Sequence, residues 1–160
     1  MTDHAASKPA DHAGVWVPPP LIYVGMFGCG VLLQVVAPLT FLPRLPARVA
    51  AVLFLGGYAL LFGWSYLLFR RTGTSMVPVK PSLALVVRGP YRLTRNPMYL
   101  SLVCLYLAAA LWFDVVWALI LGPLLVLVVQ HLVISKEERY LEQTFGEGYR
   151  QYRARVRRWI

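Results

Sequence analysis

The sequence predicts an all-α, polytopic membrane protein with about four transmembrane helices. Hydrophobic residues make up 58% of the 160-residue chain and charged residues 14%, against roughly 45–50% and about 25% in soluble globular domains. The apolar residues are concentrated in four segments, each near the roughly 20 residues that cross a hydrocarbon core. We expect a single domain over residues 18–160, preceded by a flexible polar segment, 1–17, that lacks the order of a cleaved signal.

The formal charge of +9 suggests either nucleic acid or anionic lipid as a partner. The basic residues lie between and after the apolar segments, so membrane headgroups explain them more simply and no nucleic-acid partner is expected. Cys29 and Cys104 lie inside apolar segments without metal-ligand spacing, so no metal site is predicted.

The first two helices are expected over about 21–42 and 47–69. Both ranges are long enough to cross a membrane. The first follows three consecutive prolines, and Pro38 near its end should kink or end it.

The third and fourth helices are expected over about 97–113 and 115–134. Only Asp114 separates these ranges, which predicts a tight helical hairpin and antiparallel packing. Gly122–Pro123 predicts a bend in the fourth helix.

Basic residues predict the orientation. Segment 70–95 carries six and no acid, and the tail from Lys136 carries seven, whereas the loop between the first two helices has only Arg44 and Arg48. The positive-inside rule then places both termini and both long polar segments in the cytoplasm.

The tail, 135–160, begins with residues that can continue the fourth helix to Phe145, and Gly146 marks a break. Beyond it, four apolar or aromatic residues recur at three- and four-residue spacing: Tyr149, Tyr152, Val156 and Trp159. This predicts a cytoplasmic, basic amphipathic helix on the membrane surface, either anchoring the chain or taking part in chemistry.

The run RNPMY should open the third helix. Asn96 is a favoured N-cap and Pro97 suits the first helical position. The first-turn amides and the helix dipole would form an anion site, with Arg95 able to bind a carboxylate in a bidentate fork. Gly89–Pro90 predicts a rigid turn nearby. The alternative is a capped helix whose arginines contact headgroups.

Glu137 and Glu138 are two of only seven acids in the chain. At the C-terminal end of the fourth helix, their negative charges interact unfavourably with the helix macrodipole. Another interaction should therefore explain their position. They either pair with neighbouring basic residues or recognise a cationic group of a ligand. The hairpin would return them to the same membrane face as Asn96.

The stretches GPYRLTRNPMYL and EERYLEQTFGEGYRQYRARV resemble the isoprenylcysteine carboxyl methyltransferase and phospholipid methyltransferase superfamily, over roughly residue 72 to the end. Its Arg-His-Pro-x-Tyr and Glu-Glu motifs match, in order, Arg95, Pro97, Tyr99, Glu137 and Glu138. Asn96 replaces the histidine, and an amide carries no proton between pH 5 and 8.

The resemblance implies a small integral membrane enzyme that moves a methyl group from S-adenosylmethionine to an amphiphilic acceptor, such as a prenylcysteine-like carboxylate, a lipid amine or a thiol. It implies that Glu137 binds amino or ribose groups of the cofactor and that Glu138 assists or braces the tail. The cofactor's carboxylate end would be held by Arg95 and the helix start, 96–99. The pocket would be shaped by Gly89, Pro90, Tyr91 and Tyr99.

Arg95, Asn96 and His131 are the catalytic candidates, although His131 could equally be a neutral core histidine. Tyr149 and Arg153 are expected to close the pocket over the substrate. Two rival functions stay open: a non-enzymatic membrane protein whose basic segments contact only headgroups, and a sensor that binds the cofactor without turnover. Membrane lipids are the expected partners, and the sequence leaves the acceptor and the oligomeric state open.

Overall fold

The computed structural model describes residues 18–40, 43–72 and 85–160, and within these residues every regular element is helical. The expected flexible segment 1–17 and the basic residue Lys80 lie outside the described residues. The elements are α1 (Pro19–Val36), α2 (Arg44–Thr72), a 3₁₀ turn η1 (Gly89–Arg92), α3 (Pro97–Trp112), α4 (Val116–Val129), a π turn η2 (Gln130–Ile134), α5 (Ser135–Phe145) and α6 (Glu147–Arg155). The predicted all-α class is confirmed.

Among the described residues, three helices are long and apolar enough to cross a membrane: α1, α2 and the continuous helix formed by α4, η2 and α5. The last has 30 residues, more than the roughly 20 that a hydrocarbon core requires. Its α5 part carries five charged residues among eleven and therefore extends beyond the core. Helix α3 is apolar but has only 16 residues, so a fourth crossing stays a prediction.

Two helix boundaries differ from expectation. Helix α1 ends at Val36 rather than near residue 42. Pro38 explains the earlier end, because a proline disfavours α geometry in the preceding residue and has no N–H to donate. Helix α2 begins three residues earlier than expected, and α4 runs through Pro123 without a break.

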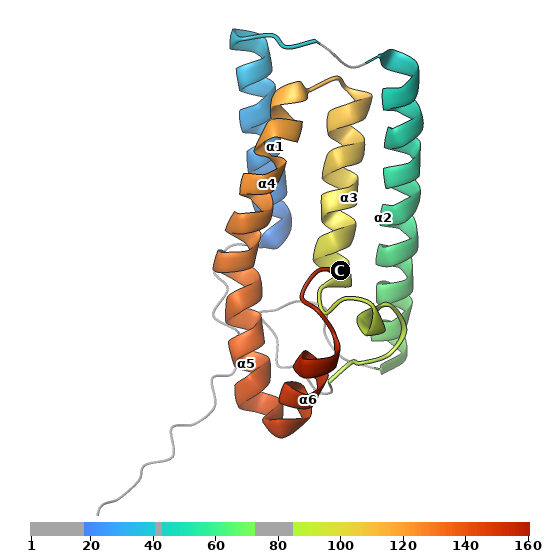
Figure 1. The fold of residues 1–160 in the computed structure, drawn as a ribbon, viewed down its shortest axis with the longest axis vertical. Coiled ribbons are helices and arrows are strands. Elements are labelled where there is room, and N and C mark those ends of the chain that lie inside the picture. The colour runs from blue at the N-terminus through green and yellow to red at the C-terminus, as the bar shows by residue number, and fades with distance from the viewer. Residues whose placement is uncertain (1–17, 41–42, 73–84) are drawn as a thin grey trace, which may run out of the picture.

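The four long helices form two packed pairs, in which α3 lies along α2 and α4 lies along α1 (Figure 1). Residues 113–115 join α3 to α4, and the two helices run antiparallel. Helices α1 and α4 approach closely at Gly30, where an added Cβ would lie 2.9 Å from the Cα of Ala118. The Tyr106 hydroxyl donates to the Ala118 carbonyl at 2.8 Å and ties α3 to the same contact.

The π turn joins α4 to α5. The Gln130 carbonyl accepts hydrogen bonds from the Ser135 N–H and from the Ser135 hydroxyl, the latter at 2.8 Å. A π turn inserts an extra residue into a helical turn. The helix axis therefore continues, while every later side chain is rotated about it.

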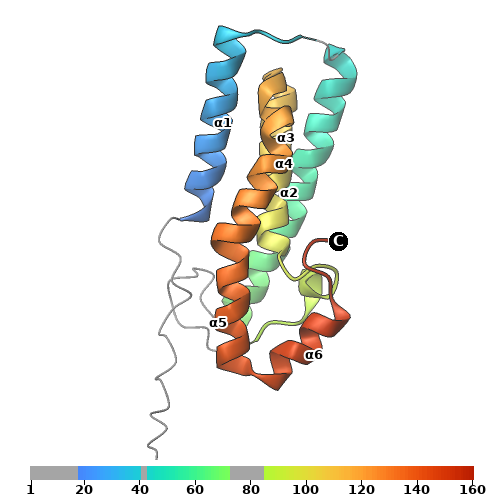
Figure 2. The same cartoon turned by 60° about the vertical axis from the view of Figure 1, so that its left-hand side comes forward.

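Beyond Gly146, which has a φ of 51°, helix α6 turns back toward the bundle, and residues 156–160 return to the start of α3 (Figures 1 and 2). We call residues 156–160 the C-terminal strap. The expected amphipathic helix would have continued to Trp159, but α6 ends at Arg155. Val156 and Trp159 are part of the strap because its backbone finds partners in the loop before α3.

Candidate functional site

The centre of the polar end of the bundle is the carboxylate of Glu138. Its side chain is 9% exposed and lies 3.1 Å from Nη1 of Arg95, which is 10% exposed. Arg158 of the strap donates from Nε and Nη2 to the two carboxylate oxygens. One buried acid therefore joins α5, the loop before α3 and the strap.

The strap is also bonded to the start of α3 through backbone carbonyls. Thr94 Oγ1 and Asn96 Nδ2 each donate to the Arg158 carbonyl at 3.0 Å. The Arg95 N–H donates to the Arg157 carbonyl at 2.9 Å. Trp159 Nε1 donates to Gln130 Oε1 at 3.0 Å and reaches the π turn.

Helix α3 begins at Pro97, directly after Asn96, as the sequence predicts. Asn96 occupies the N-cap position, but its side chain makes no capping hydrogen bond. Its amide binds the strap instead, while its own N–H donates to Thr94 Oγ1 at 3.1 Å. Pro97 follows at the first helical position, as expected, and it is buried.

Glu137 faces a different set of groups. Its carboxylate accepts a hydrogen bond from the hydroxyl of Tyr99, whose carbonyl accepts one from Tyr23 at 3.1 Å. Burial raises the pKa of Glu137 to about 7, the Tyr99 hydrogen bond opposes this, and the Glu138 charge adds to it. Burial also raises the pKa of Tyr91, and the nearby Glu137 charge acts in the same direction. Glu137 forms no ion pair within the described part of the chain.

Arg95 retains buried donor capacity. Its Nη1 lies at ion-pair distance from Glu138, but neither Nη1 nor Nε makes a directed hydrogen bond to a described residue. Tyr149, which is 1% exposed, forms a side-chain hydrogen bond with the guanidinium. Buried donors are normally satisfied, so Arg95 can still accommodate an acceptor.

The turn Gly89–Pro90 forms η1, as the sequence predicts. Gly89 has a φ of 60°, and an added Cβ would lie 2.9 Å from Nε1 of Trp64, so the turn requires glycine. Tyr152 of α6 donates to the Tyr91 carbonyl at 2.8 Å. The turn is thereby fixed between α2 and α6.

Two predicted site residues lie elsewhere. His131 lies in the π turn, and its side chain is exposed on the surface of the bundle. Arg153 is exposed and pairs through Nη1 with Glu142 Oε2 at 2.9 Å. The structure therefore does not bring either residue to the Glu137 carboxylate.

Three residues at the site were missed by the sequence reasoning: Tyr23, Thr94 and Arg158. Tyr23 could have been noticed as a phenol inside an apolar helix, and Thr94 as a hydroxyl beside RNPMY. Arg158 carried no signal, because it is one of several arginines at similar spacing.

Comparison with known proteins places both motifs inside a recognised domain. Residues 46–148 match the phospholipid methyltransferase family, well over half of the chain, from α2 into α6. An uncharacterized protein of Haemophilus influenzae is 43% identical over 63 residues, which are 39% of this chain and all of that relative. No solved structure matches the chain.

Proposed function

The chain belongs to the phospholipid methyltransferase family, and on that premise we propose that it transfers a methyl group from S-adenosylmethionine to an amphiphilic acceptor at the Glu137 site. The family consists of membrane methyltransferases, and the apolar helices make this chain an integral membrane protein. The observation that carries the proposal is the pair formed by Glu137 and Arg95. Each retains binding capacity for a group of opposite charge, and both belong to one cluster.

These residues fit the amino-acid end of the proposed cofactor. A carboxylate is complementary to the Arg95 guanidinium, whose buried Nε has no hydrogen-bond partner in the described chain. An ammonium group is complementary to Glu137, whose carboxylate accepts a hydrogen bond from the neutral hydroxyl of Tyr99 and forms no ion pair among the described residues. The rings of Tyr91 and Tyr99 border the same carboxylate and suit a sulfonium, since cations bind over aromatic faces.

The two adjacent glutamates therefore have separate roles in this proposal. Glu138 is engaged by Arg95 and Arg158 and holds the site together. Glu137 is the ligand-binding acid. Asn96 positions the strap through its amide and does not act as a base, because an amide cannot take up a proton in this pH range.

Bound S-adenosylmethionine would supply an electrophilic methyl group on its sulfonium. The contribution of the chain is orientation and exclusion of water, which together can supply roughly 7–11 kcal/mol of the barrier. The buried Tyr99 and Tyr149 side chains wall the cluster against solvent. Acceptors in keeping with a site at the end of apolar helices are a prenylcysteine-like carboxylate, a lipid amine or a thiol, and the site would face the cytoplasm.

Calorimetric titration with S-adenosylhomocysteine tests the cofactor. Wild type should bind and Glu137→Gln should not, whereas Glu142→Gln, which changes a partly exposed acid in the same helix, should bind normally. Absence of binding by folded wild type, or equal binding by Glu137→Gln, would exclude the assignment.

Incubation with isotopically labelled S-adenosylmethionine tests the reaction. Mass spectrometry of lipid extracts, prenylcysteine analogues and thiols should reveal a labelled product that Glu137→Gln does not form. Binding without any labelled product would instead favour a sensor. The absence of both binding and product would favour a non-enzymatic membrane protein.

A further inference from the structure

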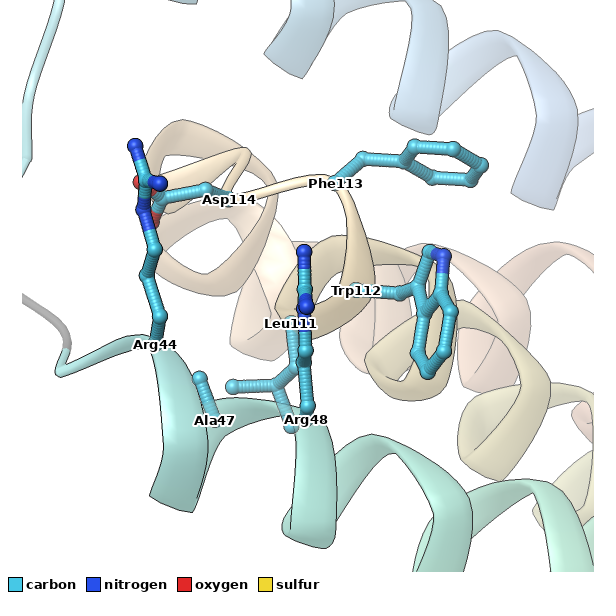
Figure 3. Close-up of a pocket in the computed structure, with 7 residues that line it drawn as sticks. All are labelled: Arg44, Ala47, Arg48, Leu111, Trp112, Phe113 and Asp114. Atoms are coloured by element: carbon cyan, nitrogen blue, oxygen red, sulfur yellow. The ribbon is translucent and has the colours of Figure 1, made fainter.

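A second cluster of charge lies at the end of the bundle opposite Glu138. Arg44 and Arg48 of α2 and Asp114 of the α3–α4 turn line a cavity of about 140 Å³, together with Leu111 and Trp112. Figure 3 shows both arginines extending from α2 toward that turn. With a rise of about 1.5 Å per residue, Asp114 and Glu138 are about 35 Å apart along the α4–α5 helix, so this cavity is separate from the proposed methyl-transfer site.

The two arginines give this end of the bundle a positive field. They are four residues apart, at the N-terminal end of α2, whose first turn contains no acid. The helix dipole adds positive potential at the same place. Neither arginine forms an ion pair with a residue of the described ranges, and Arg48 instead stacks over the Trp112 ring at 5.8 Å.

Asp114 supplies the opposite charge in the same wall. Its Oδ1 is buried without a hydrogen-bond partner among the described residues, although buried polar atoms are normally satisfied. Its φ of 55° fixes the carboxylate on a tight turn. The cavity therefore offers two cationic donors for an anion and one acceptor that lacks a donor.

The surrounding side chains place the cavity at the level of lipid headgroups. Trp112 is 52% and Phe113 is 68% exposed, and both stand at the end of an apolar helix. Aromatic residues are enriched at the membrane–water interface. A lipid headgroup is thus the phosphate-bearing group that meets this surface at the highest concentration.

We propose that this cavity binds the headgroup of a zwitterionic phospholipid, with its phosphate between Arg44 and Arg48 and its ammonium group at Asp114. The volume suits a headgroup and excludes acyl chains, which would lie against the apolar outer faces of α2 and α3. The bound lipid is distinct from the methyl acceptor, because it sits at the other end of the helices.

Native mass spectrometry of the full chain in detergent, titrated with phosphatidylethanolamine, tests the proposal. Arg44→Gln/Arg48→Gln should weaken lipid binding about tenfold or more, since it removes the charge-assisted hydrogen bonds to phosphate. Arg70→Gln/Arg71→Gln is the matched control, because it removes two exposed charges from the other end of α2. Equal binding by wild type and Arg44→Gln/Arg48→Gln overturns the proposal.

Asp114→Asn tests the ammonium contact. Asparagine tolerates the left-handed backbone, so the turn should persist, and circular dichroism checks this. The variant should lose affinity for phosphatidylethanolamine and not for phosphatidylglycerol, which has no ammonium group. Equal losses for both lipids, or none, contradict the zwitterionic assignment.

Competition by free glycerophosphoethanolamine as strong as that by the lipid would instead indicate a site for soluble phosphate esters. Single Arg44→Gln and Arg48→Gln variants replace the double variant if it does not fold.

Discussion

The charged residues at the two ends of the helix bundle differ in their burial and in their ion pairing. At the Glu138 end, a buried acid forms ion pairs with two arginines, of which Arg95 is buried and Arg158 is about one-third exposed. At the Arg44 end, two arginines and an acid line an open cavity without forming an ion pair in the described structure. The residue types are the same, but their burial and partners differ.

The difference separates charges that hold the fold together from charges available to a ligand. A buried pair must stay intact, because removing one partner leaves the other desolvated and uncompensated. Exposed, unpaired side chains contribute little to stability and keep their binding capacity. Glu137 lies at the same end as Glu138, but in our proposal it is available to a ligand.

The largest expected effect follows from removing the centre of the buried network. Glu138→Ala leaves Arg95 buried without its counter-charge and releases the strap, so it should lower the free energy of unfolding by about 3–5 kcal/mol. Denaturant titration in micelles measures this. Glu142→Ala, whose partners Arg150 and Arg153 are exposed, should cost about 1 kcal/mol or less. Equal losses in the two variants would remove the distinction between the ends.

A smaller effect is expected from the strap side of the same network. Arg158→Ala removes both hydrogen bonds to the Glu138 carboxylate but leaves Arg95 in place. A single hydrogen bond to a charged group contributes about 1.5–3 kcal/mol. Because the Arg158 side chain is 33% exposed and solvent screens its charge, the same titration should show a loss of about 1.5–3 kcal/mol for the two bonds together. A loss as large as that of Glu138→Ala would mean that Arg95 contributes little.

The next effect is a pH dependence of ligand binding. Glu137 has a pKa raised by burial to about 7, and it must be ionised to bind an ammonium group. Affinity for S-adenosylhomocysteine should therefore fall about tenfold between pH 8 and pH 6. Calorimetry at the two pH values measures this. Equal affinity of wild type at pH 8 and pH 6 would contradict the assigned role.

The free protein should respond in the opposite direction. Because the folded-state pKa exceeds the ordinary value of 4.5, the contribution of Glu137 to stability is fully present below about pH 4.5 and is lost as the pH rises through about 7. Melting temperatures across this window should decline in wild type and change less in Glu137→Gln.

The smallest effect is expected at the opposite end. Arg44→Ala/Arg48→Ala removes exposed side chains without ion-pair partners in the described chain, so unfolding free energy should change by about 0.5 kcal/mol or less. Denaturant titration without added lipid checks this. A loss of several kcal/mol would show that these arginines are structural, as at the other end.

The sequence predicted the helices well because apolar length and proline positions determine them locally. It also predicted that RNPMY and the glutamate pair share one end of the bundle. It could not predict which glutamate is paired, because that depends on the direction of each side chain around the helix. Nor could it predict the strap, since the spacing of Tyr149, Tyr152, Val156 and Trp159 is equally compatible with a continuing helix, and backbone contacts with residues 94–96 decided the outcome.

The π turn has a consequence for how the glutamate pair is compared between relatives. With 3.6 residues per turn, one extra residue rotates everything after it by about 100°. A chain that lacked this insertion would keep both glutamates and the same spacing in most of the motif, yet present a different side of α5 to α3. The π turn Gln130–Ile134 sets the rotation of α5 about its axis. This rotation, together with the motif, determines which acid meets Tyr99 and which meets Arg95.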